Sequence, residues 1–404
     1  MFELIIKDKK KLYKILNFLL LISFFWVIYI NSAYFIEKII LGNTELFFDL
    51  KYIHQGFVET LSGINTYEIH PPYYNQPTTS LPPYLLYLFK NLGNLDFLVF
   101  TKYFLLLQVI SIILLLYYCY SLFNLKEIIF FFPFIYFFCF NFSAGLSLTV
   151  GNIAIILYGI ISLGLIYLYK NKVLIFCSLI FIVSLFKFYL IIFYFLPILI
   201  YGFKYLKTII LFLSFLLIIN ITYYIVYPDI YNAWINLMEI QTLRKPNNPW
   251  VGTDISHAFA TITSKFGNMI HKGYYPSTLT INIFYLFVTS ITFLSILIIN
   301  YRKGNKSSNE KLKLISFGLL TIFLFYPRLM IYDFFIIIPV YYYLVKEITF
   351  SQEKKINALI KLTLLILFLI VQDTHSGLSS MSLLFFLICF LEYKNKNPLK
   401  LKTK

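Results

Sequence analysis

Long apolar segments separated by short polar connections run through the whole chain. Twelve can be delimited, at residues 15–31, 98–122, 128–142, 150–169, 173–186, 190–203, 208–227, 279–300, 314–326, 331–345, 357–371 and 377–391. A helix of about 20 apolar residues crosses the ~30 Å hydrocarbon core of a bilayer, and only helices satisfy their own backbone there as separate spans. The pattern predicts an all-α polytopic membrane protein with about 12 transmembrane helices (about 10–13), forming one integral membrane domain over residues 1–404.

Residues 173–203 fit either one long helix or two short ones. Lys187 and Pro197 interrupt the apolar run, which favours two helices joined at FKFY. Both ends of the run are basic, KNK at 170–172 and KYLK at 204–207. Because basic ends gather on one side of a membrane, the segment is predicted to be a hairpin.

Composition and charge narrow the class of protein. A 60% hydrophobic content and a mean hydropathy of +0.78 exclude a soluble domain. The net charge of +16 would suit nucleic-acid binding, but with a cytoplasmic N-terminus 24 of the 34 basic residues fall on the cytoplasmic side. The charge is therefore topological. We reject nucleic acid as a partner and place both termini in the cytoplasm; the abundance of Lys, Ile, Phe, Tyr and Asn suggests a bacterial cytoplasmic membrane.

Two long connections, 32–97 and 228–278, are predicted on the outer face. They hold four of the five histidines and two of the three tryptophans, Trp234 and Trp250. The first is predicted to carry an interfacial helix stopped by Gly63 and Asn65, followed by a proline-broken stretch that becomes helical only after Pro83. The second is predicted to form two short amphipathic helices.

Asp49 is the candidate general base. It lies among Phe47, Phe48 and Tyr52, and burial among aromatic side chains raises the proton affinity of a carboxylate. The alternative is a helix-surface acid that pairs with Lys51 or a lipid headgroup.

Lys187 and Arg328 are candidate phosphate ligands, because both lie at span ends in apolar surroundings. A charge at membrane depth costs about 2.5–3.5 kcal/mol and normally has a partner or a function. Arginine binds phosphate through two donors. Alternatively, Lys187 extends to the interface and Arg328 pairs with Asp333; both readings of Arg328 hold if Asp333 orients it.

Asp254 and His257 share a helix face near Trp250 in the second outer connection. Tryptophan and tyrosine line sugar sites and also form membrane-interface belts. Two ligands are too few for a metal, so no metal is predicted.

Four short motifs in the predicted outer regions resemble one known family. The first outer connection has an acid, a tyrosine, a G-x-x-x-Y sequence and a Pro-Pro pair, carried by Asp49, Tyr52, Gly56, Gly63, Tyr67, Pro82 and Pro83. Gly151-Asn152 is similar to a Gly-Gln-x-Asn motif, and Lys187-Phe188-Tyr189-Leu190 to Lys-Leu-Tyr-Pro without the proline. YPRLMIYD at 326–333 aligns with a late polar motif. In this order the motifs resemble glycosyltransferase family 87, membrane enzymes of the GT-C fold.

The resemblance implies a glycosyltransferase that moves a hexose or pentose, with inversion, from a polyprenyl-phosphate-linked sugar to a cell-envelope hydroxyl on the outer face. It implies that Asp49 is the general base and that the lipid-linked sugar is the donor substrate, with no cofactor; the acceptor is a glycan, lipid or protein. The residues predicted to bind substrates are Lys187, Arg328, Tyr52, His54, Tyr67, Asn152, Tyr189, Asp254, His257 and Asp333.

Two other functions stay open. A polysaccharide polymerase or ligase acting on lipid-linked glycans would share the outer site and the lipid donor. A 12-span secondary transporter would share the topology. Against a transporter, residues 1–203 and 204–404 show no convincing repeat, and every acid falls in or beside a loop, whereas ion-coupled transport usually needs carboxylates near mid-bilayer.

Overall fold

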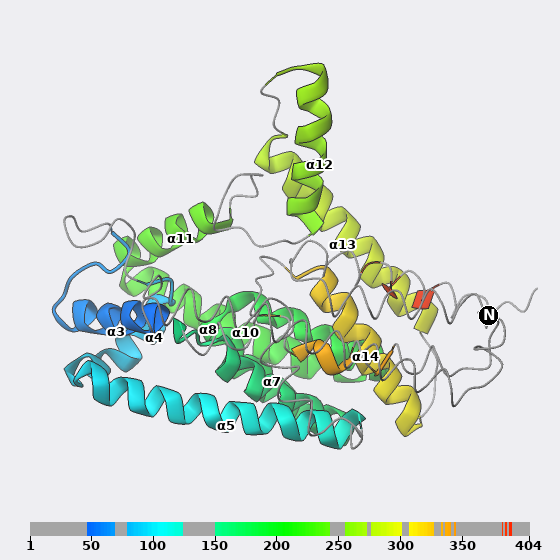
Figure 1. The fold of residues 1–404 in the computed structure, drawn as a ribbon, viewed down its shortest axis with the longest axis horizontal. Coiled ribbons are helices and arrows are strands. Elements are labelled where there is room, and N and C mark those ends of the chain that lie inside the picture. Colours follow the sequence, from blue (N-terminus) through cyan, green and yellow to red (C-terminus); the bar gives the residue numbers. More distant parts are fainter. Residues whose placement is uncertain are drawn as a thin grey trace, which may run out of the picture.

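The computed structural model describes residues 47–68, 79–123, 150–242, 255–272, 276–300 and 307–326, with scattered positions at 333, 336–340, 343, 344, 382, 384, 385, 388 and 389. Across these ranges the regular secondary structure is helical (Figure 1). This confirms the all-α class for the part of the chain that is described.

The order of helices follows the apolar pattern closely. The two long connections that are predicted to be outer supply α3 (Phe48–Leu61), α4 (Pro83–Phe89), the 3₁₀ helix η2 (Lys90–Asn94), α11 (Pro228–Thr242) and α12 (Ile255–Ile270). The apolar segments supply α5 (Phe97–Phe123), α7 (Ala154–Tyr169), α8 (Val173–Phe186), η3 (Phe188–Tyr194), α9 (Phe195–Tyr201), η4 (Gly202–Tyr205), α10 (Leu206–Val226), α13 (Thr278–Asn300) and α14 (Ser308–Leu324).

Three helical stretches in the described ranges are long and apolar enough to cross a membrane: Phe97–Phe123, Phe188–Val226 and Leu279–Ile298. The exposed sides of these helices carry apolar residues, and Leu106, Leu217 and Leu286 are all more than half exposed. Such surfaces are typical of helices in contact with lipid. The predicted segments 15–31, 128–142 and 357–371 lie outside the described residues, so the number of twelve stays a prediction.

The predicted hairpin at 173–203 is confirmed by two tyrosine hydrogen bonds. The Tyr194 hydroxyl donates to the carbonyl of Cys177 at 3.0 Å, and the Tyr201 hydroxyl to that of Leu168 at 2.9 Å. The later of the two tyrosines thus contacts the earlier of the two carbonyls, which shows that η3 and α9 run antiparallel to α8. The tip of the hairpin is Lys187.

The helices in the outer connections begin and end where the sequence indicates. α3 ends at Leu61, just before Gly63, which takes a positive φ of 77°. α4 begins at Pro83, a residue whose fixed φ suits the first helical turn. Among the apolar segments, α7 begins at Ala154 rather than 150, and α14 begins at Ser308 rather than 314, because Ser307 and Glu310 form a reciprocal capping box.

Two apolar clusters build the interior. The larger joins α7, α8, α9 and α14, with Tyr158, Phe193 and Phe323 among its buried members. The smaller joins α3, α4, the start of α5 and α11 around Leu50 and Trp234. The candidate site lies where the two clusters meet, because Ile153 and Phe186, which neighbour Asn152 and Lys187, pack against both.

Candidate functional site

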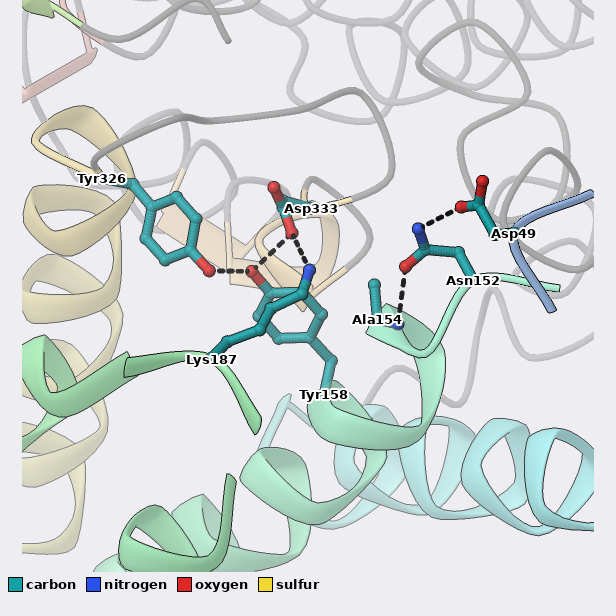
Figure 2. A network of polar contacts seen from close by, with 7 residues as sticks. All are labelled: Asp49, Asn152, Ala154, Tyr158, Lys187, Tyr326 and Asp333. Carbon is teal, nitrogen blue, oxygen red and sulfur yellow. Dashed lines mark hydrogen bonds and ion pairs between the residues drawn. The ribbon is translucent and has the colours of Figure 1, made fainter. Parts of the chain in front are cut away.

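Asp49 lies in the first turn of α3 and is joined to the beginning of α7. Its Oδ2 accepts a hydrogen bond of 2.6 Å from the Nδ2 of Asn152. The Oδ1 of Asn152 accepts a 2.8 Å hydrogen bond from the backbone N–H of Ala154 (Figure 2). The side-chain amide of Asn152 is therefore held by the first residue of α7, and in this position it orients the carboxylate of Asp49.

Gly151 makes this approach of α3 to α7 sterically feasible. It has a positive φ of 72°, and a Cβ at this position would lie 2.6 Å from the Cβ of Leu50. A glycine is required both by the backbone conformation and by the close packing. From the other side, Gln108 of α5 donates from Nε2 to the carbonyl of Asn152 at 3.4 Å, which further fixes the Gly-Asn turn.

The environment of Asp49 favours its neutral form. Burial raises the pKa of this carboxyl above its usual value of 3.8, while the hydrogen bond from Asn152 and the positive charge of Lys187 partly oppose the rise. Burial is the largest of the three effects. A carboxylate whose proton affinity is raised is a better general base than a solvated one.

Lys187 lies at the hairpin tip, where α8 has ended and the backbone is extended with φ −134° and ψ 97°. Its Nζ is 4.0 Å from Oδ1 of Asp333, and its side chain is 17% exposed. The Tyr158 hydroxyl lies 2.9 Å from the same Oδ1 and 2.9 Å from the Tyr326 hydroxyl (Figure 2). A cation, a carboxylate and two phenols thus form one cluster.

The hairpin is short for a membrane span. α8 has 14 residues, so it rises about 21 Å, against ~30 Å for the hydrocarbon core. If the basic turns at 170–172 and 204–207 lie at the inner surface, Lys187 lies inside the bilayer thickness and not beyond it. A charge at that depth needs a partner, and Asp333 is the one described.

The structure brings five of the predicted site residues to this region. Asp49 and Asn152 are bonded to each other, Lys187 and Asp333 form an ion pair, and the Tyr189 ring lies 5.9 Å from the Lys187 Nζ. Asp49, Asn152, Lys187 and Asp333 come from separate parts of the sequence. The segment ends that carry them, all predicted to be outer, therefore lie close together.

Two other predicted residues have structural partners instead. His54 Nε2 is 2.9 Å from the carbonyl of Leu95, and its ring contacts Phe97 and Phe100. The Tyr67 hydroxyl donates to the carbonyl of Leu81 at 2.5 Å in a buried position. His54 therefore joins α3 to the end of η2, and Tyr67 joins the two parts of the connection between α3 and α4.

The remaining predicted residues divide into two groups. Tyr52 packs edge-on against Phe48 on α3, with ring centroids 4.7 Å apart. Arg328 and Asp254 lie outside the described residues, as does the side chain of His257 on α12.

The structure shows that Asp333 is buried. Its side chain is 0% exposed, which the prediction that every acid falls in or beside a loop did not specify. Its burial is stabilised by the Lys187 ammonium and the Tyr158 hydroxyl, which the sequence separates from it by more than a hundred residues. The sequence-based interpretation missed this because local hydropathy does not reveal such partners.

Tyr158, Tyr326 and Gln108 were missed by sequence reasoning. Gln108 carried a usable signal, an amide in the middle of an apolar helix, where polar groups are costly. Tyr326 begins the YPRLMIYD motif at 326–333, which was a usable signal. Tyr158 carried none, because the chain has 35 tyrosines and many occur within apolar runs.

In the described part of the chain, no three metal-ligating side chains of His, Cys, Asp or Glu lie together. Comparison with known protein families, with curated proteins and with solved structures finds no match. The site must therefore be interpreted from its own chemistry.

Proposed function

We propose that the protein is a membrane glycosyltransferase that moves a sugar from a polyprenyl-phosphate donor to an acceptor hydroxyl on the outer face of the membrane. The observation that carries this proposal is the pairing of a partly buried carboxylate, Asp49, which Asn152 orients, with a cation that acts on it electrostatically, Lys187. The motif resemblance to glycosyltransferase family 87 supports the same reading and suggests a GT-C fold.

In the proposed reaction Asp49 accepts the proton of the acceptor hydroxyl as its oxygen attacks the anomeric carbon. The bond between that carbon and the phosphate oxygen breaks, and its electron pair leaves with the polyprenyl phosphate. Lys187 stabilises the departing anion by its positive charge. The raised pKa of Asp49 suits the first step, since a base is most effective when its proton affinity approaches the operating pH.

The direct test is Asp49→Asn, which keeps the size of the side chain and an oxygen for the Asn152 hydrogen bond. We expect sugar transfer in membranes to fall by about 10²–10⁴-fold, the typical contribution of a general base. Transfer is measured with a polyprenyl-phosphate hexose as donor and membranes of a deletion strain as acceptor.

Asp229→Asn is the matched control. Asp229 is an exposed acid in the first turn of α11, also in a predicted outer connection, so the same exchange there should leave transfer unchanged. If Asp49→Asn retains more than about a tenth of wild-type activity at equal expression, Asp49 is not the base.

A secondary transporter is the second candidate, because Asp333 is completely buried and paired with Lys187. Buried ion pairs of this kind are typical of proton-coupled transport. The transporter would be indicated if proteoliposomes of the wild-type protein dissipated an imposed pH gradient and those of Asp333→Asn did not.

A further inference from the structure

Asp333 cannot contact a substrate directly, because its side chain is fully buried. Its Oδ1 has two described neighbours, the Tyr158 hydroxyl at 2.9 Å and the Lys187 ammonium at 4.0 Å. Lys187, by contrast, is partly exposed. Of the two charged groups in the pair, only the ammonium is able to reach a ligand.

The hydrogen-bonded chain behind Asp333 has one consistent direction. A carboxylate only accepts, and the Tyr158 hydroxyl has a single proton to give. Tyr158 therefore donates to Asp333, and Tyr326 donates to Tyr158 across 2.9 Å. Tyr326 in turn is fixed by ring contacts, stacked on Phe323 at 5.5 Å and edge-on to Tyr189 at 5.1 Å.

The pair of Lys187 and Asp333 is looser than a direct charge-assisted hydrogen bond, which spans about 2.7–2.9 Å. At 4.0 Å the carboxylate offsets the charge of Lys187 without a direct hydrogen bond between Nζ and Oδ1. In Figure 2 the Nζ lies between the Asp333 cluster and the Asn152–Asp49 pair. An anion that binds there would contact Lys187 without displacing Asp333.

We infer that Asp333, Tyr158 and Tyr326 form a positioning unit, which fixes the Lys187 ammonium for the phosphate group of a polyprenyl phosphate, both in the sugar-linked donor and as the departing monoester, while touching no substrate themselves. The inference rests on the proposed function, and it assigns a role to two tyrosines outside the predicted site. It also changes the role of Asp333 from substrate ligand to positioning residue.

Binding of farnesyl phosphate to the full-length protein in nanodiscs tests the unit without requiring sugar transfer. The affinity for farnesol, which has the same chain without the charged phosphate, measures the contribution of the lipid chain alone. Lys187→Gln, Asp333→Asn and Tyr158→Phe should each weaken farnesyl phosphate binding about tenfold or more and leave farnesol binding unchanged. Tyr326→Phe should have a smaller effect in the same direction, because it acts through Tyr158.

Tyr118→Phe is the matched control. Tyr118 is also fully buried, and its hydroxyl has no hydrogen-bond partner in the described structure. Removing that hydroxyl should change neither affinity. A comparable loss in Tyr118→Phe would show that any buried phenol matters and would overturn the proposed unit.

The decisive result is the behaviour of double variants. If Asp333 and Tyr158 act through Lys187, then Asp333→Asn and Tyr158→Phe should have almost no further effect on binding in a Lys187→Gln background. Effects that add fully would overturn the positioning role and leave the phosphate site intact. Should Asp333→Asn fail to fold, Tyr158→Phe carries the same comparison.

The outcomes also separate the inference from the proposed function. If wild-type protein binds farnesyl phosphate no more tightly than farnesol, a lipid-phosphate donor is excluded and both proposals are wrong. If the double-variant coupling is found but Asp49→Asn transfers sugar normally, the positioning unit stands and the assigned base does not.

Discussion

At the residue scale, the carboxylates of Asp49 and Asp333 differ in the partners that surround them. Asp333 has a cation and a phenol beside it, and its side chain is completely buried. Asp49 is only partly buried and is bonded to a neutral amide, which leaves its pKa raised. The arrangement around Asp49 favours a group that gains and loses a proton.

The raised pKa of Asp49 predicts how stability depends on pH. The native state binds this proton more tightly than the unfolded chain, whose carboxyl has a pKa of 3.8. Asp49 therefore contributes most to the free energy of unfolding below pH 3.8, and this contribution is lost as the pH rises through the pKa of the native state. Above that pKa, the partly buried charge of Asp49 destabilises the fold. Asp49→Asn should melt at the same or a higher temperature than wild type near about pH 7.

That difference should shrink as the pH falls toward 3.8, where wild-type Asp49 becomes protonated. Thermal unfolding of the detergent-solubilised protein at several pH values measures it. A lower melting temperature for Asp49→Asn near about pH 7 would mean that the carboxylate is stabilised as an ion, in conflict with the raised pKa.

At the element scale, the site depends on how closely helices approach. Glycine permits two of these contacts: Gly151 beside Leu50, and Gly159 of α7, where a Cβ would lie 2.6 Å from that of Ser111 on α5. The hairpin of α8 with η3 and α9 then brings Lys187 to the same end of α7 as Asn152. Positions in three helices thus meet because small residues remove the bulk between them.

Gly151→Ala should separate α3 from α7 and weaken the hydrogen bond between Asn152 and Asp49. Overpacking of this kind typically costs about 1–3 kcal/mol, and we expect sugar transfer to fall about tenfold or more, since small misplacements at a site reduce rates strongly. Activity and melting temperature of the purified variant give the two measurements.

Gly63→Ala separates close packing from backbone strain. Gly63 has a similar positive φ of 77°, but a Cβ there meets nothing within 4 Å. The Gly63→Ala variant should therefore show the effect of backbone strain alone, with a modest loss of stability and nearly normal sugar transfer. Equal loss of transfer in both variants would refute the packing argument for Gly151.

At the scale of the whole molecule, the described contacts sort the segment ends into two groups. Lys311 donates from Nζ to Oδ1 of Asn171 at 2.6 Å, and the Tyr201 hydroxyl donates to the same oxygen at 2.9 Å. Lys311 and Asn171 belong to connections that the lysine distribution predicts to be cytoplasmic, and Tyr201 is near the end of the segment 190–203 that leads into a third such connection. Asp49, Asn152, Lys187 and Asp333 form the other group, at the ends predicted to face outward.

Single cysteines in a cysteine-free background test this arrangement. Ser62→Cys, just after α3, should react with a membrane-impermeant maleimide in intact cells, and Lys204→Cys in η4 only after permeabilisation. Both native positions are exposed. Labelling of both from the same side would contradict the two groups, and a reversed pattern would keep the groups but place the site in the cytoplasm.

The sequence by itself determined the helical membrane class, most helix bounds in the described ranges and the hairpin with Lys187 at its tip. These follow from hydropathy, from proline and glycine positions and from the distribution of lysine, which act over a few neighbouring residues. Asp49 and Asn152 were also identified as candidates from short motifs, although their direct hydrogen bond was not.

Only the tertiary structure decided which side chains meet. Tyr158 and Asp333 are 175 residues apart in sequence, and no local pattern indicates that they are hydrogen-bonded or that Asp333 lies beside Lys187. The burial of Asp333, the structural use of His54 and Tyr67, and the close fit of Gly151 against Leu50 depend likewise on helix packing. Apolar periodicity fixes which residues form a helix, whereas the partner of a buried polar group is fixed by the helices packed around it.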